Sequence, residues 1–138
     1  MQYSECRGFS GGIVVAWQSE EVMVNVEVKD FQFLHLMISL HDGPTWMFTA
    51  VYANPKEELR KELWMKLLNI SKHITGGCLI DIGAMGTKFT WRGPLLNGHS
   101  RIFERLDRAL SNDEWFFHVL IFLITTLFLC CFMECKLR

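Results

Sequence analysis

Residues 45–74, "TWMFTAVYANPKEELRKELWMKLLNISKHI", change from one hydrophobic period to another within a few positions. In 45–52 large apolar residues alternate with a second set, which is typical of a β-strand because successive side chains lie on opposite faces. Asn54 suits a helix N-cap and Pro55 the first helical position. Leucine and isoleucine then recur every three or four residues, so we expect an amphipathic helix over 55–73.

Upstream of this stretch, the chain has the pattern of further strands. Residues 11–17 are an apolar run behind two glycines, which is typical of a buried strand. In 22–28 the four valines alternate with other residues and are expected to share one face. Residues 31–40 are apolar at both sets of alternating positions, which predicts an interior strand. A turn is expected at 41–44, "HDGP".

Downstream of the helix the elements are expected to be shorter. The pattern predicts strands at 78–82 and 87–91, separated by the turn "GAMG". A loop is expected over 92–100, and a short strand or helix over 101–110. Strands covered by one amphipathic helix indicate a mixed α/β (α+β) fold. At 138 residues, the chain is about the size of one domain.

Charge and cysteine content exclude some classes of function. The net charge is −1, so no global basic field favours nucleic acid. A local basic cluster remains, which either contacts phosphates or forms a solvated face: Lys88, Arg92, Arg101, Arg105 and Arg108. The five cysteines form no C-x-x-C pair, so neither a zinc site nor a disulfide framework is expected. The first residues lack the pattern of a secretory signal.

Residues 115–133, "WFFHVLIFLITTLFLCCFM", differ in kind from the rest. They contain no charged residue and are followed by Lys136 and Arg138. A helix needs about 20 apolar residues to cross a bilayer core, so this segment is long enough to span. Three interpretations remain open: a membrane helix, unrelated sequence that is apolar by chance, or a segment that packs on the sheet.

The order of four motifs resembles one family. They are "FSGGIVVAW" (9–17), "WMFTAVYANP" (46–55), "LIDIGAMGTKFTWRG" (79–93) and "RIFERLDRALSNDEW" (101–115). Together they resemble the endonuclease/exonuclease/phosphatase family, in the branch encoded by plant non-LTR (LINE-type) retrotransposons. The resemblance implies a domain over 8–114 with a partial four-layer αββα sandwich, followed by the apolar helix at 115–133. Members of this family hydrolyse phosphate esters with Mg²⁺, and the retrotransposon domains nick DNA.

Two residues match the family's active-site positions. Tyr52, in "AVYANP", corresponds to an active-site tyrosine, and Asp107, in "ERLDRAL", to the aspartate that orients a catalytic histidine. The family's Gly-Asp-x-Asn and Ser-Asp-His motifs are absent, which indicates an internal deletion. Asp81 ends an apolar strand, where a carboxylate can in principle hold a metal ion, although a structural position is the simpler interpretation.

The residues also have purely structural interpretations. Tyr52 is then an aromatic residue at a strand end, and Asp107 forms salt bridges with its neighbouring arginines. His35 is expected to be a hydrogen-bonded histidine inside the sheet. Trp17, Trp46 and Trp91 are expected in the core.

The leading functional hypothesis is therefore a degenerate retrotransposon endonuclease domain without catalysis, bound cofactor or an established DNA partner. The alternative is a small single-pass membrane-associated protein with a non-catalytic binding or scaffold domain. The deletion also predicts marginal stability, because strand edges and apolar faces lose their partners.

Overall fold

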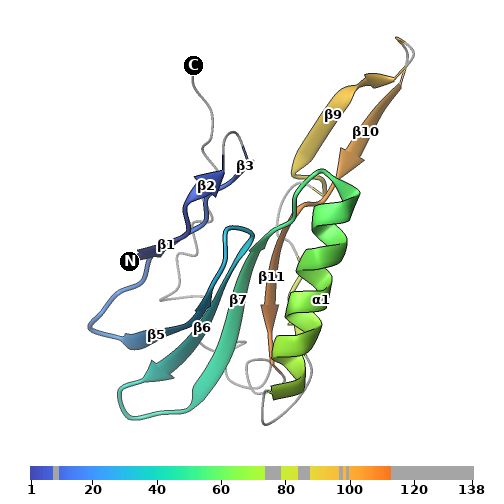
Figure 1. The fold of residues 1–138 in the computed structure, drawn as a ribbon. Coiled ribbons are helices and arrows are strands. Elements are labelled where there is room, and N and C mark those ends of the chain that lie inside the picture. Colours follow the sequence, from blue (N-terminus) through green and yellow to red (C-terminus); the bar gives the residue numbers. More distant parts are fainter. Residues whose placement is uncertain (8–9, 74–78, 84–87, 97, 99, 113–138) are drawn as a thin grey trace.

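The computed structural model describes residues 1–7, 10–73, 79–83, 88–96, 98 and 100–112. Their fold is mixed α+β, with mostly antiparallel strands and one helix (Figure 1). The expected apolar helix at 115–133 lies outside the described residues. Across the part of the chain that the structure describes, no helix is long and apolar enough to cross a membrane.

A five-stranded antiparallel sheet is the centre of the fold (Figure 1). Its strands, in spatial order, are β5 (Val22–Lys29), β6 (Phe33–Leu40), β7 (Thr45–Tyr52), β11 (Asp107–Ser111) and β8 (Ile80–Asp81). The first three are consecutive hairpins, as their alternating patterns and turns predict. β11 comes from far along the chain and lies between β7 and β8.

Strand β6 is interior, as predicted. Leu34 and Leu36 pack in the core on one face, and Phe33 packs in the core on the other. The prediction that four valines of β5 share one face is confirmed only in part. Val22 is buried but Val28 is 38% exposed, because the β5–β6 register shifts between Val26 and Val28. A bulge of this kind turns the following side chain away from its expected face.

Helix α1 (Glu57–His73) covers one face of the sheet, here called the helix face (Figure 1). It begins near the predicted position because the Asn54 side chain caps it, accepting a hydrogen bond from the Lys56 N–H at 2.9 Å. Leu63 and Leu67 of the predicted apolar stripe are buried. They pack against apolar side chains of the sheet and its connections: Phe33, Val51, Ala53, Leu106 and Leu110.

The opposite face of the sheet has a second apolar cluster. Side chains of β5, β6 and β7 form most of it, and Ile13 and Val15 from the N-terminal part complete it. Val15 belongs to β4 (Val14–Val15), which pairs with β1 (Gln2–Tyr3). A further small pair joins β2 (Cys6–Arg7) and β3 (Ser10–Gly11). The prediction of one buried strand over 11–17 is therefore wrong, because this stretch contains only the end of β3 and the two-residue β4, although Ile13 and Val15 are buried.

The segment expected to be a loop, 92–100, is instead mostly a β-hairpin. β9 (Trp91–Leu96) pairs with β10 (Ser100–Glu104), and the hairpin extends beyond the end of the sheet (Figure 1). Gly93 and Pro94 suggested a break in regular structure, but a strand in a two-stranded ribbon has a free edge that tolerates proline. Gly98, with φ of 76°, supplies the left-handed conformation of the turn.

The alternative of a helix over 101–110 is wrong, and that of a strand is correct. The segment contains two strands, β10 and β11, separated by Arg105 and Leu106. The expected strand at 87–91 is also displaced, because β9 begins only at Trp91. The prediction for the tryptophans is confirmed fully for Trp46, which is buried. Trp17 and Trp91 are only partly buried against the two clusters.

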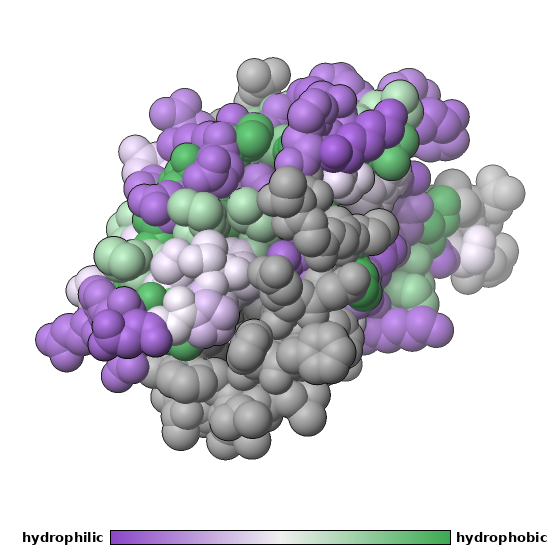
Figure 2. Space-filling model, turned by 90° about the horizontal axis from the view of Figure 1, so that it is seen from below, coloured by the Kyte–Doolittle hydropathy of each residue, from purple (hydrophilic) through white to green (hydrophobic). Residues whose placement is uncertain are grey.

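Large apolar side chains remain at the surface. Both outer strands of the sheet, β5 and β8, pair on one side only among the described elements. Figure 2 shows one face of the molecule, on which hydrophobic residues lie among hydrophilic ones. Met23 and Leu68, for example, are 49% and 50% exposed, and the expected loss of partners and marginal stability stay predictions.

Candidate active site

Tyr52 and Asp107, the two residues that match the family's active site, are direct neighbours across two strands. They are paired in the register of β7 and β11. The adjacent backbone bond, from Ala53 N–H to the Leu106 carbonyl, is 2.8 Å long. Tyr52 is buried, with 7% of its surface exposed. Two residues far apart in the sequence therefore meet where β7 ends and β11 begins.

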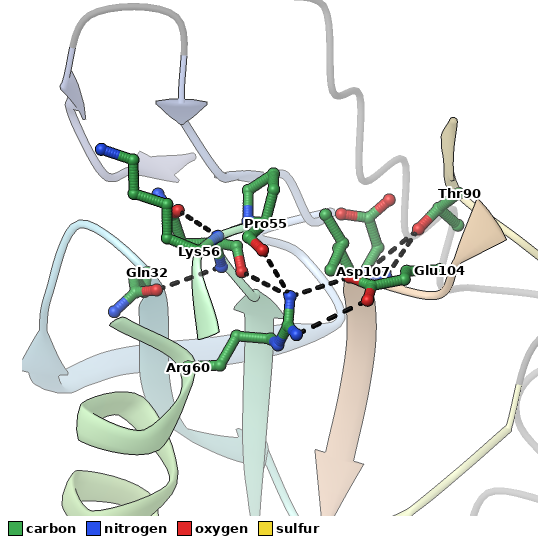
Figure 3. Close-up of polar contacts among 9 residues, drawn as sticks. Gln32, Pro55, Lys56, Arg60, Thr90, Glu104 and Asp107 are labelled. Carbon is green, nitrogen blue, oxygen red and sulfur yellow. Dashed lines mark hydrogen bonds and ion pairs between the residues drawn. The ribbon is translucent and has the colours of Figure 1, made fainter. Parts of the chain in front are cut away.

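The Asp107 carboxyl lies in a poorly solvated position. Its Oδ1 is buried and has no hydrogen-bond partner among the described residues. Burial raises the pKa of Asp107, and a hydrogen bond with Thr90 and the charge of Arg105 offset only part of that rise. The Thr90 hydroxyl oxygen also accepts hydrogen bonds from the backbone N–H groups of Leu106 and Asp107, at 3.0 and 3.2 Å (Figure 3).

The arginines that flank Asp107 in the sequence bind a different carboxylate. Arg105 Nη2 donates to Asp81 Oδ1 at 3.0 Å, and Arg108 Nη1 donates to Asp81 Oδ2 at 2.6 Å. The Gly83 N–H also donates to Asp81 Oδ1, at 2.9 Å. The structural interpretation predicted that these arginines form salt bridges with Asp107. In the structure they form them with Asp81 instead.

These contacts decide the ionisation of Asp81. Burial alone favours the neutral acid, but the Gly83 hydrogen bond and the charges of Arg108 and Arg105 outweigh it. The pKa of Asp81 is therefore lowered. Both carboxylate oxygens are occupied by donors, so Asp81 is poorly suited to bind a metal ion. Within the described ranges, no group of three or more His, Cys, Asp or Glu residues is arranged to hold one.

Asp81 and Asp107 lie on opposite faces of the sheet. Asp81 pairs with Leu110, which packs in the helix-face cluster, and directly paired residues share a face. Asp107 pairs with Tyr52, which belongs to the opposite cluster. The fold thus brings Tyr52 and Asp107 together and does not bring Asp81 to them.

His35 is a hydrogen-bonded histidine inside the sheet, as predicted. It is 3% exposed, and its Nδ1 lies 2.7 Å from Thr49 Oγ1. Burial lowers the pKa of His35, while the charge of Glu27 raises it in part. The ring is therefore held neutral by its position, which suits a structural role.

A polar network near the candidate site was not predicted from the sequence (Figure 3). Gln32 is fully buried; its Nε2 donates to the Leu59 carbonyl at 3.2 Å and its Oε1 accepts from the Asn54 N–H at 3.1 Å. Arg60 donates to the Pro55 carbonyl at 2.7 Å and to Glu104 Oε2 at 2.8 Å. The network joins α1 to the ends of β7 and β10. Its members are polar residues at unrelated spacings, so the sequence holds no pattern that could reveal them.

The predicted basic cluster divides into two sets. Arg105 and Arg108 bind Asp81, whereas Lys88, Arg92 and Arg101 are exposed around the hairpin. Lys88 lies 5.6 Å from the ring centroid of Phe89, and Arg92 lies 6.0 Å from that of Phe103. The choice between phosphate contact and a solvated face stays open.

The chain matches no family model, no curated protein and no solved structure. Membership of the endonuclease/exonuclease/phosphatase family therefore stays a prediction from the sequence motifs.

Proposed function

We propose that this chain is a degenerate retrotransposon-type endonuclease domain that keeps part of an active-site framework and does not cleave DNA. The observation that carries the proposal is the register of β7 and β11, which pairs Tyr52 with Asp107. The resemblance selects these two residues from separate motifs, without reference to their distance. A chance match would have no reason to place them opposite each other in one sheet.

The architecture is compatible with a partial four-layer αββα sandwich. Helix α1 covers the helix face of the central sheet, as an outer helical layer would. Ile13 and Val15 pack on the opposite face, where the family has its second sheet. We propose that the short pairs β1–β4 and β2–β3 are the reduced remainder of that second sheet.

The residues present do not fit the Mg²⁺ of the parent family. A hard cation requires several oxygen ligands, and its bound water has to be deprotonated for hydrolysis. Both oxygens of Asp81 accept hydrogen bonds from arginines, on the face away from Asp107. The sequence contains neither Gly-Asp-x-Asn nor Ser-Asp-His. Loss of several members of a cooperative catalytic unit removes most of its activity.

Nicking of supercoiled plasmid by the purified full chain tests the proposal. We expect no difference between reactions with Mg²⁺ and with EDTA. Asp107→Ala and Asp81→Ala variants serve as controls, because a contaminating nuclease would be unaffected by either. Mg²⁺-dependent nicking that Asp107→Ala abolishes would overturn the proposal and make Asp107 a catalytic residue.

The alternative function, a small membrane-associated binding or scaffold protein, is favoured by the uncharged segment 115–133. Flotation of the full chain with lipid vesicles separates the two. Stable association with vesicles in high salt, lost on removal of 115–138, would support the membrane alternative. Recovery of the full chain away from the lipid would contradict it.

A further inference from the structure

A groove lies on the helix face between α1 and the β9–β10 hairpin. Its volume is about 370 Å³, and its walls include Trp64 from α1 together with Phe89 and Phe103. Its lining also includes Ala53 and Leu106, the immediate sequence neighbours of the candidate active-site pair. Because neighbouring strand residues point to opposite faces, the groove is separated by the sheet from the Tyr52–Asp107 pair.

The groove carries an excess of positive charge. Arg60, Arg105 and Arg108 line it. Arg60 is neutralised by Glu104, but the other two arginines share one carboxylate, that of Asp81. Residues 79–111, which include Asp81, contain five cations and three anions, a net charge of +2. Since the whole chain carries −1, the remainder carries −3, and the positive charge is concentrated at this region.

The groove also exposes large apolar side chains. Trp64, Phe89 and Phe103 are 40%, 47% and 48% exposed. The guanidinium of Arg108 lies 5.8 Å from the Trp64 ring centroid. Contiguous exposed apolar surface rimmed by charge is typical of a binding surface.

We propose that this groove binds an acidic segment of a partner protein that carries aromatic or aliphatic side chains. The acids are recognised by the excess arginine charge, and an apolar side chain packs between Trp64 and Phe103. The partner is a protein because the groove joins arginine and aromatic residues, which are enriched at protein interfaces, to a ribbon whose edges are unpaired among the described strands and can accept a peptide backbone. A nucleic acid has no backbone N–H groups to pair with such an edge.

The hairpin strengthens this assignment. Strands β9 and β10 pair only with each other, so within the described part of the chain both edges of the ribbon are unpaired. A two-stranded ribbon is marginally stable alone and gains from an added partner. A bound segment can therefore add backbone hydrogen bonds to its side-chain contacts.

The test is fluorescence anisotropy of a labelled peptide of alternating glutamate and phenylalanine, titrated with the full chain. We expect binding that weakens with added salt and is about tenfold weaker in Trp64→Ala and in Phe103→Ala. Met65→Ala is the matched control, because Met65 is 66% exposed on the same helix and does not line the groove. Circular dichroism checks that each variant keeps the fold.

Three outcomes would overturn the proposal. They are absence of binding by the full chain, equal binding by Trp64→Ala, Phe103→Ala and the unaltered chain, and equal binding of a lysine–phenylalanine peptide. Tighter binding of an oligothymidylate than of the acidic peptide would assign the groove to single-stranded nucleic acid instead. None of these results depends on whether the chain cleaves DNA, so failure here is distinct from failure of the proposed function.

Discussion

The two faces of the central sheet provide opposite environments for a partly buried acid. On the helix face, Asp81 is bound by Arg105, Arg108 and the Gly83 N–H, and its pKa is lowered. On the opposite face, Asp107 has a buried oxygen without a partner, and its pKa is raised. One carboxylate therefore stabilises the fold in its charged form, while the other costs stability. A pKa raised by burial is also common at active-site positions, which is compatible with the proposal for Asp107.

The largest expected effect concerns the packing of the helix face. Leu63 is fully buried under α1, so Leu63→Ala should lower the free energy of unfolding by about 2–5 kcal/mol. Urea denaturation of the full chain measures the change. The control is Leu68→Ala, since Leu68 is 50% exposed on the same helix and should change stability by less than about 0.5 kcal/mol. Equal effects of the two variants would show that α1 does not pack on this face.

Removal of the Asp81 carboxylate should have an intermediate effect. Asp81→Ala leaves Arg105 and Arg108 without their acceptor, and we expect a loss of about 1–2 kcal/mol at pH 7. The pKa of Asp81 is lowered in the folded protein, so its contribution is present above the unfolded pKa and is lost as pH falls through the folded pKa. The unaltered chain and the variant should therefore converge in acid.

The control for Asp81 is Glu57→Ala. Glu57 forms an ion pair with Lys61 on the exposed side of α1, where such pairs contribute little. Urea midpoints of both variants at neutral and acidic pH complete the comparison. A loss for Asp81→Ala no greater than for Glu57→Ala would contradict a stabilising role of the arginine contacts.

The smallest expected effect has the opposite sign. Asp107→Asn removes a charge that burial disfavours, so it should stabilise the fold at pH 7 by up to about 1 kcal/mol. The folded pKa of Asp107 is raised above the usual 3.8, so the charged form costs stability as pH rises through this region. The gain should therefore vanish as pH falls below 3.8. Destabilisation by Asp107→Asn at pH 7 would show that the carboxylate has a stabilising partner.

The local elements were largely predictable from the sequence, and the hairpin was not. Helix α1 follows from the leucine spacing and the Asn54 cap, and β6 and β7 follow from their alternation. Gly93 and Pro94 led to the prediction of a loop where β9 forms. Local preferences were overridden there because pairing with β10 supplies the backbone hydrogen bonds.

Candidate site residues were predictable one by one, but their grouping was not. Tyr52, Asp81 and Asp107 were all identified from the sequence as candidates. Their order in the chain does not reveal that Asp81 lies on the other face, because its side is decided by pairing with Leu110. The groove could not be predicted from the sequence for the same reason, because its walls come from two separate segments, α1 and the hairpin.

The sequence by itself determined the periods of the strands and of the helix, because alternation and the 3.6-residue repeat depend only on neighbouring positions. It also determined the excess of positive charge in 79–111. Tertiary structure alone decided that Tyr52 meets Asp107 and that two arginines converge on Asp81. Those outcomes depend on hydrogen-bond register between distant segments, and a shift of one residue would move each side chain to the other face.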